Sequence, residues 1–125
     1  MDMHSLELDV GCYAAAVYHE SNTQSLQEKL GVLNVVRNRL KSGRWGNTVC
    51  SVVYASGQFI GVTDPAHEDV DTKVFLETEL FVIDAIVFNK YTNPVANSLY
   101  FHDDSIKKVS KWGKKTVKIG RMVFY

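Results

Sequence analysis

The stretch Gly11-Cys-Tyr-Ala-Ala-Ala-Val-Tyr-His-Glu20 decides how this chain folds. Its small and aromatic residues carry almost no charge, which predicts a buried, central helix over about residues 5–19. The run ends in an acid, Glu20, and a polar loop from Ser21 to Gln24 follows. A carboxyl group among apolar side chains resists losing its proton, and a raised pKa is what a general acid needs near neutral pH. Glu20 is therefore the first candidate for a catalytic residue.

Further helices follow this run. Ser25 with Glu28 matches a capping box and predicts a helix that ends before Gly43. A short helix is predicted from the cap candidate Thr48 to Ala55, and a longer one from about Asp71 to Phe88. Residues expected to face inward are, in the first helix, Leu8, Cys12 or Tyr13, Ala15, Ala16 and Val17. In the helix after Ser25 they are Leu26, Leu30, Leu33, Val36 and Leu40. In the helix from about Asp71 they are Phe75, Leu76, Leu80 or Phe81, Ile83 and Val87.

The C-terminal part of the chain has a different character. Residues 98–102, 115–119 and 122–125 are short aromatic or β-branched segments, which predict small strands. Helices first and strands late indicate an α-rich α+β fold. At 125 residues, the chain is expected to form a single domain, 1–125.

Charge is balanced overall but segregated along the chain. The formal net charge is zero, so composition gives no argument for nucleic acid or a membrane as a partner. Seven acidic residues and one basic residue lie between Asp64 and Asp84, whereas seven basic residues and no acid lie between Lys107 and Arg121. Two interpretations of the basic stretch remain: a surface that holds a polyanion, or a solvated surface that faces the acidic part of the same fold.

The two cysteines, Cys12 and Cys50, are expected to be small, buried hydrophobic side chains, with a disulfide between them as the alternative. Cysteine and histidine spacing matches no metal site, and no glycine-rich phosphate loop is present, so we expect no metal and no cofactor. The N-terminal residues lack the pattern of a signal peptide, and no apolar run approaches the roughly 20 residues that span a bilayer. We therefore expect a monomer that is made in the cytoplasm.

An ordered set of motifs resembles the catalytic domain of the SleB-type cell wall hydrolases, which include spore cortex-lytic enzymes and short phage relatives. The resemblance covers about residues 10–125, and its motifs are Val17-Tyr-His-Glu20, Asn38-Arg39, Trp45, Thr48-Val-Cys-Ser-Val-Val-Tyr54, Gly57-Gln-Phe59, Leu99-Tyr-Phe101, Trp112, Ile119-Gly120 and Phe124-Tyr125. The loop after Glu20 departs from the family in lacking acidic and glycine residues, and the closing motif lacks a histidine.

The resemblance implies a lysozyme-like fold and a peptidoglycan substrate. It implies cleavage of the β-1,4 bond between N-acetylmuramic acid and N-acetylglucosamine by a lytic transglycosylase reaction that leaves 1,6-anhydro-muramyl ends. Glu20 falls on the family's catalytic glutamate. Such an enzyme would act on the cell wall, and the short chain, without a signal peptide or a wall-binding module, suits a phage lysis or virion protein.

The number of acids near Glu20 agrees with that chemistry. A glycoside hydrolase uses two carboxylates, about 5–9.5 Å apart. The first acid after Glu20 is Glu28, which the capping box already explains. Transglycosylation needs only one carboxyl group, whose pKa we expect to be raised to about 6. Asp64, Asp103 and Asp104 lie far off in sequence, so a hydrolytic muramidase remains the alternative.

Several polar and aromatic residues are candidates for binding the glycan. Gln58 and Tyr100 are expected in the cleft, with Phe59 partly in the core. Tyr18 and Asn38 complete the predicted substrate-binding set, Asn38 together with Arg39 also bracing the loop after Glu20. His19 is expected to be structural, because it points about 100° away from Glu20 around the helix. An alternative from another class is a non-catalytic protein that binds an anionic glycan or nucleic acid through Lys107–Arg121.

Overall fold

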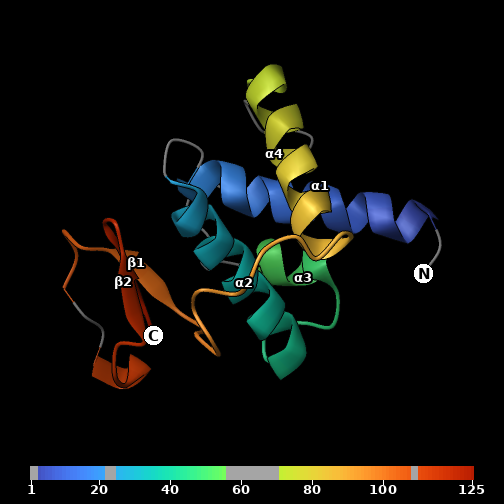
Figure 1. Cartoon of the computed structure of the whole chain (residues 1–125). Helices are drawn as coiled ribbons and strands as arrows, with labels where there is room; N and C mark the ends of the chain where they lie inside the picture. Colours follow the sequence, from blue (N-terminus) through green and yellow to red (C-terminus); the bar gives the residue numbers. More distant parts are fainter. Residues whose placement is uncertain (1–2, 22–24, 56–70, 108–109) are drawn as a thin grey trace.

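In the computed structural model, a helical body carries a small sheet on one side (Figure 1). The structure describes residues 3–21, 25–55, 71–107 and 110–125. The elements in chain order are α1 (Met3–Ser21), α2 (Leu26–Ser42), α3 (Val49–Val53), α4 (Thr72–Ile86), β1 (Phe101–Asp103), the 3₁₀ helix η2 (Ser110–Trp112), β2 (Val117–Ile119) and β3 (Met122–Phe124). The predicted α-rich α+β fold is confirmed.

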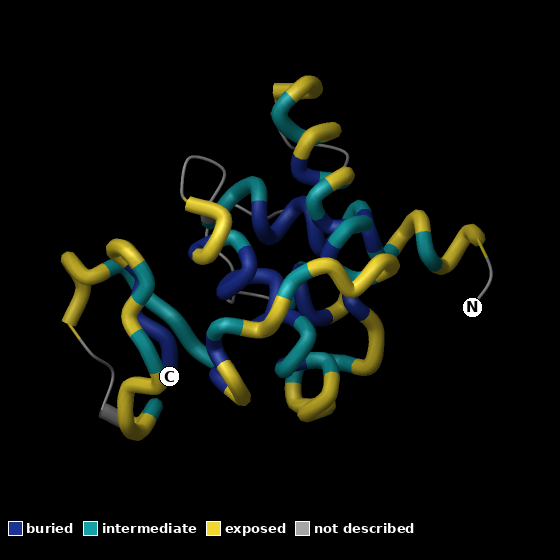
Figure 2. Tube along the Cα trace, viewed as in Figure 1, coloured by how far each residue is buried: buried dark blue, intermediate teal, exposed yellow. Residues whose placement is uncertain are grey.

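Helix α1 is the centre of the body and packs against α2, α3 and α4. Its residues Ala14 to Val17 are at most 1% exposed, which confirms the prediction of a buried helix. Leu8, predicted to face inward, is 51% exposed. Figure 2 shows the reason, since the N-terminal turns of α1 extend beyond the helices that cover the rest of it.

Helix α2 begins and ends at the predicted signals. The Ser25 hydroxyl accepts a hydrogen bond from the backbone N–H of Glu28 at 3.2 Å, and the Glu28 carboxylate accepts one from the backbone N–H of Ser25 at 3.3 Å. Gly43, with φ +73°, donates its N–H to the carbonyl groups of the last turn. Of the residues predicted to face inward, Leu30, Leu33 and Val36 are buried, whereas Leu26, in the first turn, is 44% exposed.

Helix α4 begins where predicted, because the Asp71 side chain accepts the N–H of Val74. Its predicted inner face is only partly confirmed. The buried residues are Thr78, Val82 and Ala85, whereas Leu76 is 55% exposed. Small side chains let α4 approach α1 closely, and its N-terminal half projects from the body with larger apolar residues on its surface (Figure 2). Of the other residues predicted to face inward, Leu80 and Val87 are also exposed, and Phe75, Phe81 and Ile83 are half-buried.

The three predicted strands are confirmed and form one antiparallel sheet in the order β1-β3-β2. Phe124 of the central strand pairs with Phe101 on one side and Val117 on the other. The ring of Phe124 is fully buried and lies against Gly31 of α2. This contact anchors the sheet on the helical body.

Cys12 and Cys50 form a disulfide that joins α1 to α3, with 5.2 Å between their Cα atoms. The expectation of two unbonded hydrophobic side chains was therefore wrong. Their positions 38 residues apart gave no pairing signal, whereas the packing of α3 on α1 brings them together.

Candidate active site

Glu20 lies in the last turn of α1, and its side chain is half-buried. The guanidinium group of Arg39, near the end of α2, is close enough for the two charges to interact. Burial lowers the pKa of Arg39 to about 10, while the charges of Tyr100 and Glu20 raise it. The same attraction favours the ionised form of the Glu20 carboxyl group and opposes the effect of its burial. The raised pKa expected for Glu20 thus stays a prediction.

Arg39 also connects this end of α1 to the sheet. Only 4% of Arg39 is exposed, and its Nε atom donates a hydrogen bond to the carbonyl oxygen of Leu99 at 2.7 Å. Its Cζ atom lies 4.4 Å from the centroid of the Trp45 ring and 5.6 Å from that of Tyr100. A buried cation between aromatic rings and a carbonyl group is held in one position.

Asn38 also forms hydrogen bonds to the segment that precedes Tyr100. Its side-chain amide donates to the carbonyl oxygens of Ala96 at 2.8 Å and Ser98 at 2.9 Å. The sequence prediction had Asn38 and Arg39 bracing the loop after Glu20, most of which lies outside the described residues; their described hydrogen bonds hold residues 96–99. Asn38, predicted to bind substrate, therefore positions the segment that leads into Tyr100.

Three aromatic side chains form a connected row beside Arg39, which we call the aromatic row: Trp45, Tyr100 and Trp112. Tyr100 and Trp112 stack with ring centroids 4.9 Å apart and planes inclined by 9°. Trp45 meets Tyr100 edge-on at 5.8 Å. All three are half-buried, so part of each ring is accessible. Apolar rings with an exposed part suit stacking against sugar rings.

The structure places predicted Tyr100 in the aromatic row together with two tryptophans that lie outside the predicted substrate-binding set. Both lie in family-like motifs, and their sequence alone gave no sign that they would meet Tyr100. Behind Trp112, the Nε2 atom of His102 and the hydroxyl of Tyr125 are hydrogen-bonded at 2.8 Å. Both side chains pack on Trp112, with ring centroids 6.0 Å and 5.6 Å from it, and so support the row.

The other predicted binding residues are not brought to the row by the described contacts. The Tyr18 hydroxyl accepts the backbone N–H of Asp71 at 2.8 Å, and its ring meets Phe75 edge-on, so Tyr18 fastens α1 to the start of α4. Gln58 and Phe59 lie outside the described residues, as does Asp64. No described contact therefore tests the binding roles expected of Gln58 and Phe59.

The remaining candidate acids have other partners. Asp103 and Asp104 form ion pairs with Arg121 at 3.4 Å and 3.2 Å, and Asp104 also pairs with Lys118 at 3.3 Å. Hydrogen bonds from Ser105 lower the pKa of Asp103, so it is a poor general acid. Glu28 is 5% exposed and serves the capping box.

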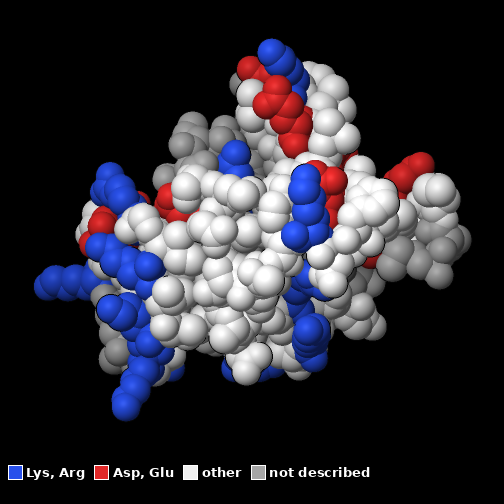
Figure 3. All heavy atoms as spheres, in the orientation of Figure 1, with Lys and Arg blue, Asp and Glu red and all other residues white. Residues whose placement is uncertain are grey.

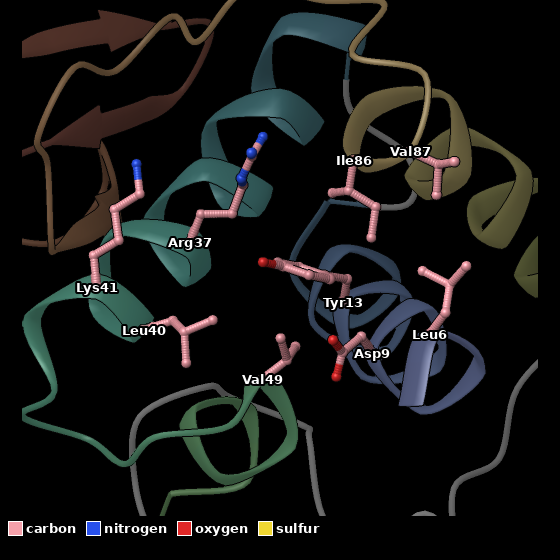
Figure 4. A pocket seen from close by; sticks show the side chains of 9 residues that line it. All are labelled: Leu6, Asp9, Tyr13, Arg37, Leu40, Lys41, Val49, Ile86 and Val87. Carbon is pink, nitrogen blue, oxygen red and sulfur yellow. The ribbon is translucent and has the colours of Figure 1, made fainter. Parts of the chain in front are cut away.

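Hollows lined by described residues lie elsewhere on the molecule. One cavity has a volume of about 440 Å³. Figure 4 shows the side chains that line it, among them Asp9 and Tyr13 from α1 and Arg37 from α2. Burial, followed by the charge of Asp9, raises the pKa of Tyr13 to about 12, while Arg37 lowers it. At 1.5 Å per residue, Asp9 lies about 16 Å along α1 from Glu20. An apolar groove of about 540 Å³ lies between the start of α1 and α4, and Glu20 lines neither hollow.

Two other kinds of site are absent from the described residues. Among the described residues, no three His, Cys, Asp or Glu side chains gather as a metal site would require. Of the helices described, none combines the length and apolar character needed to cross a bilayer.

Comparisons with known proteins agree with the resemblance seen in the motifs. The catalytic domain of the Bacillus cereus SleB protein superposes with a TM-score of 0.75 at 28% identity, over 94% of this chain and 89% of that one. The catalytic domain of the germination-specific lytic transglycosylase SleB from Bacillus anthracis gives 0.71 at 28% identity, over 93% and 92%. No curated protein matches the chain significantly.

The profile of the family described as "Cell Wall Hydrolase" matches residues 23–125, a range that begins three residues after Glu20. The match spans most of the sequence, and the helices and sheet have the arrangement of the two SleB catalytic domains. The chain therefore belongs to the cell wall hydrolase family, a family of peptidoglycan-degrading enzymes.

Proposed function

We propose that this protein is a lytic transglycosylase that cleaves the β-1,4 bond between N-acetylmuramic acid and N-acetylglucosamine in peptidoglycan. The observation that carries the proposal is the position of Glu20, half-buried and electrostatically coupled to an arginine that packs against the aromatic row. The similarity to a catalytic domain named as a lytic transglycosylase supports this type of reaction.

In this reaction a single carboxyl group acts twice. Protonated Glu20 gives its proton to the glycosidic oxygen as the bond from that oxygen to C1 of the muramic acid breaks. The C6 hydroxyl of the same sugar then attacks C1, and the Glu20 carboxylate takes the hydroxyl proton. The products are a free C4 hydroxyl and a 1,6-anhydro ring, no water is consumed, and Glu20 is protonated again. Because the nucleophile belongs to the substrate, proximity replaces an activated water.

The described carboxylates support a one-carboxyl mechanism. Glu28 is engaged in the capping box, and Asp103 and Asp104 are engaged with basic residues at the sheet. Arg39 places a positive charge beside the site, where it would stabilise the carboxylate that remains after the first proton transfer. The aromatic row would hold the sugar rings.

The test is mass analysis of purified peptidoglycan after digestion by the wild-type protein, by Glu20→Gln and by the matched control Glu7→Gln, which alters an exposed acid near the start of α1. The wild-type protein and Glu7→Gln should release muropeptides with anhydro ends, each lighter by one water molecule than a reducing end. Glu20→Gln should release none.

Three outcomes would overturn the proposal. Reducing ends from the wild-type protein would identify a hydrolytic muramidase with a second carboxylate. Normal cleavage by Glu20→Gln would show that another residue is the acid. If the wild-type protein binds the polymer and never cleaves it, the non-catalytic alternative holds.

A further inference from the structure

Figure 3 shows basic side chains gathered over the side of the molecule that carries the sheet. Residues 100–125 contain seven basic residues and two acidic ones. The two acids, Asp103 and Asp104, already pair with Arg121 and Lys118. Four other lysines are exposed and form no ion pair within the described part of the chain: Lys107, Lys111, Lys114 and Lys115. We call these four the lysine face.

The lysine face adjoins the aromatic row. Lys111 lies in η2 directly before Trp112, whose ring stacks on Tyr100. Gly113, with φ +81°, then turns the chain, and Lys114 and Lys115 follow at once. Three positive charges thus lie within three residues of a ring in the row. A ligand that stacks on Trp112 brings whatever its sugars carry into reach of these ammonium groups.

We propose that the lysine face binds the carboxylate groups of the peptide branches on the same glycan strand whose sugars stack on the aromatic row. This inference rests on the proposed function, since it takes peptidoglycan as the ligand. The sugar backbone of that polymer is uncharged, and its negative charges are the free carboxylates of the peptides on the muramic acid residues. The protein has no net charge, so any attraction to such a polymer must come from a local patch.

The proposed contact gives the enzyme a preference for peptide-bearing glycan. Exposed ammonium and carboxylate groups attract each other weakly, pair by pair, and salt screens that attraction. Several pairs together orient the polymer and speed its association. The aromatic row would then act on all glycan strands, and the lysine face only on strands that carry peptides.

The experiment measures co-sedimentation at low salt with two insoluble ligands. One is peptidoglycan freed of phosphate-bearing polymers, and the other is the same cross-linked peptidoglycan after its peptide carboxylates have been converted to uncharged amides with a carbodiimide and ammonia. All proteins carry Glu20→Gln so that binding is read without cleavage. Replacing Lys111, Lys114 and Lys115 by Gln should weaken binding to the untreated peptidoglycan by about tenfold and leave binding to the amidated peptidoglycan unchanged. The loss should shrink at high salt.

Matched controls separate charge from structure. Replacement of the same three lysines by Arg keeps the charge and should keep the preference. Replacement by Gln of Lys29, Lys41 and Lys73, which lie on α2 and α4, makes the same change in net charge elsewhere and should not alter it. An unchanged urea unfolding midpoint shows that the Gln variant is folded.

Several results would overturn the inference. If the Gln variant binds as well as the protein with its lysines intact, the lysine face is a solvated surface without a role in binding. An equal loss on both ligands would mean that the lysines contact the sugars. A loss seen only with walls that retain phosphate-bearing polymers would make phosphate the ligand. Cleavage by the Glu20→Gln protein would refute the proposed function. The lysine face would still be tested, by measuring binding to the glycan strands that remain uncleaved.

Discussion

The Nε atom of Arg39 donates a hydrogen bond to the carbonyl oxygen of Leu99 across 2.7 Å, and this bond ties α2 to the residue that precedes Tyr100. Arg39 is also within electrostatic reach of Glu20. One buried side chain therefore relates the candidate acid to the aromatic row.

Arg39→Lys should lower both stability and activity. Lysine keeps the charge but lacks the planar donor group, so the Leu99 carbonyl loses its partner at a cost of about 1–3 kcal/mol. Urea unfolding and the rate of peptidoglycan cleavage measure the two effects. Lys41→Ala, an exposed change in the last turn of α2, serves as the control and should alter neither. Wild-type stability in Arg39→Lys would contradict the role given to this hydrogen bond.

Trp112→Ala should weaken binding to peptidoglycan more than it weakens the fold. The half-buried ring stacks on Tyr100, and its loss removes one face of the aromatic row. Loss of one stacked aromatic ring is worth about 0.5–1.5 kcal/mol, so binding of Glu20→Gln/Trp112→Ala in co-sedimentation should fall by roughly two- to tenfold. Tyr91→Ala removes a half-buried ring that packs on Phe81 of α4 and should leave binding intact. If Trp112→Ala and Tyr91→Ala bind peptidoglycan equally well, the aromatic row is not part of the binding site.

Gly31→Ala and Gly11→Ala should have opposite effects on stability. A Cβ atom at Gly31 would overlap the buried ring of Phe124, at a cost of about 1–3 kcal/mol. A Cβ atom at Gly11, within α1, meets nothing within 4 Å, and alanine there should add about 0.5–1 kcal/mol. Thermal unfolding of both variants measures the contrast. A destabilised Gly11→Ala together with a neutral Gly31→Ala would refute the packing described for the sheet.

Replacing both Cys12 and Cys50 by Ala should lower the free energy of unfolding by about 4 kcal/mol, because the bond closes a loop of 38 residues. Urea unfolding with and without a reductant measures this effect. The wild-type protein should fall to the stability of the double variant when reduced, and the variant should not respond to the reductant. A wild-type protein that is insensitive to reductant would argue that the two cysteines are not bonded in solution.

Tyr13 should make the fold sensitive to alkaline pH. Burial raises the pKa of its phenol to about 12 from its usual value of 10.0. Above pH 10 the unfolded chain ionises this group while the folded protein does not, so stability present below pH 10 is lost as pH rises toward 12. The full loss is about 2–3 kcal/mol. Tyr13→Phe should lack this loss when unfolding in urea is compared at pH 9 and 11. Parallel losses in both proteins would contradict it.

Features that depend on neighbouring residues were predictable from the sequence. The capping box at Ser25, the end of α2 at Gly43 and the cap of α4 at Asp71 each rest on local backbone chemistry. The burial of α1 followed from a run with almost no charge, and the three strands from their residue types.

Features that depend on distant packing were not predictable. The buried positions of α4 are Thr78, Val82 and Ala85, because small residues allow close approach to α1, whereas counting bulky apolar residues also selected the exposed Leu76, Leu80 and Val87. The partners of Arg39 come from a segment 60 residues away. For the same reason Trp112 was left out of the predicted substrate-binding set, since nothing near it in sequence reveals that it stacks on Tyr100.

The packing of the Phe124 ring against Gly31 has a consequence for protein engineering. Any chimera that imports the strands of another cell wall hydrolase onto this helical body brings a new residue to the spot where the ring now rests. Position 31 and the incoming central strand must therefore be exchanged together, and libraries that shuffle the two segments independently will consist largely of mismatched combinations.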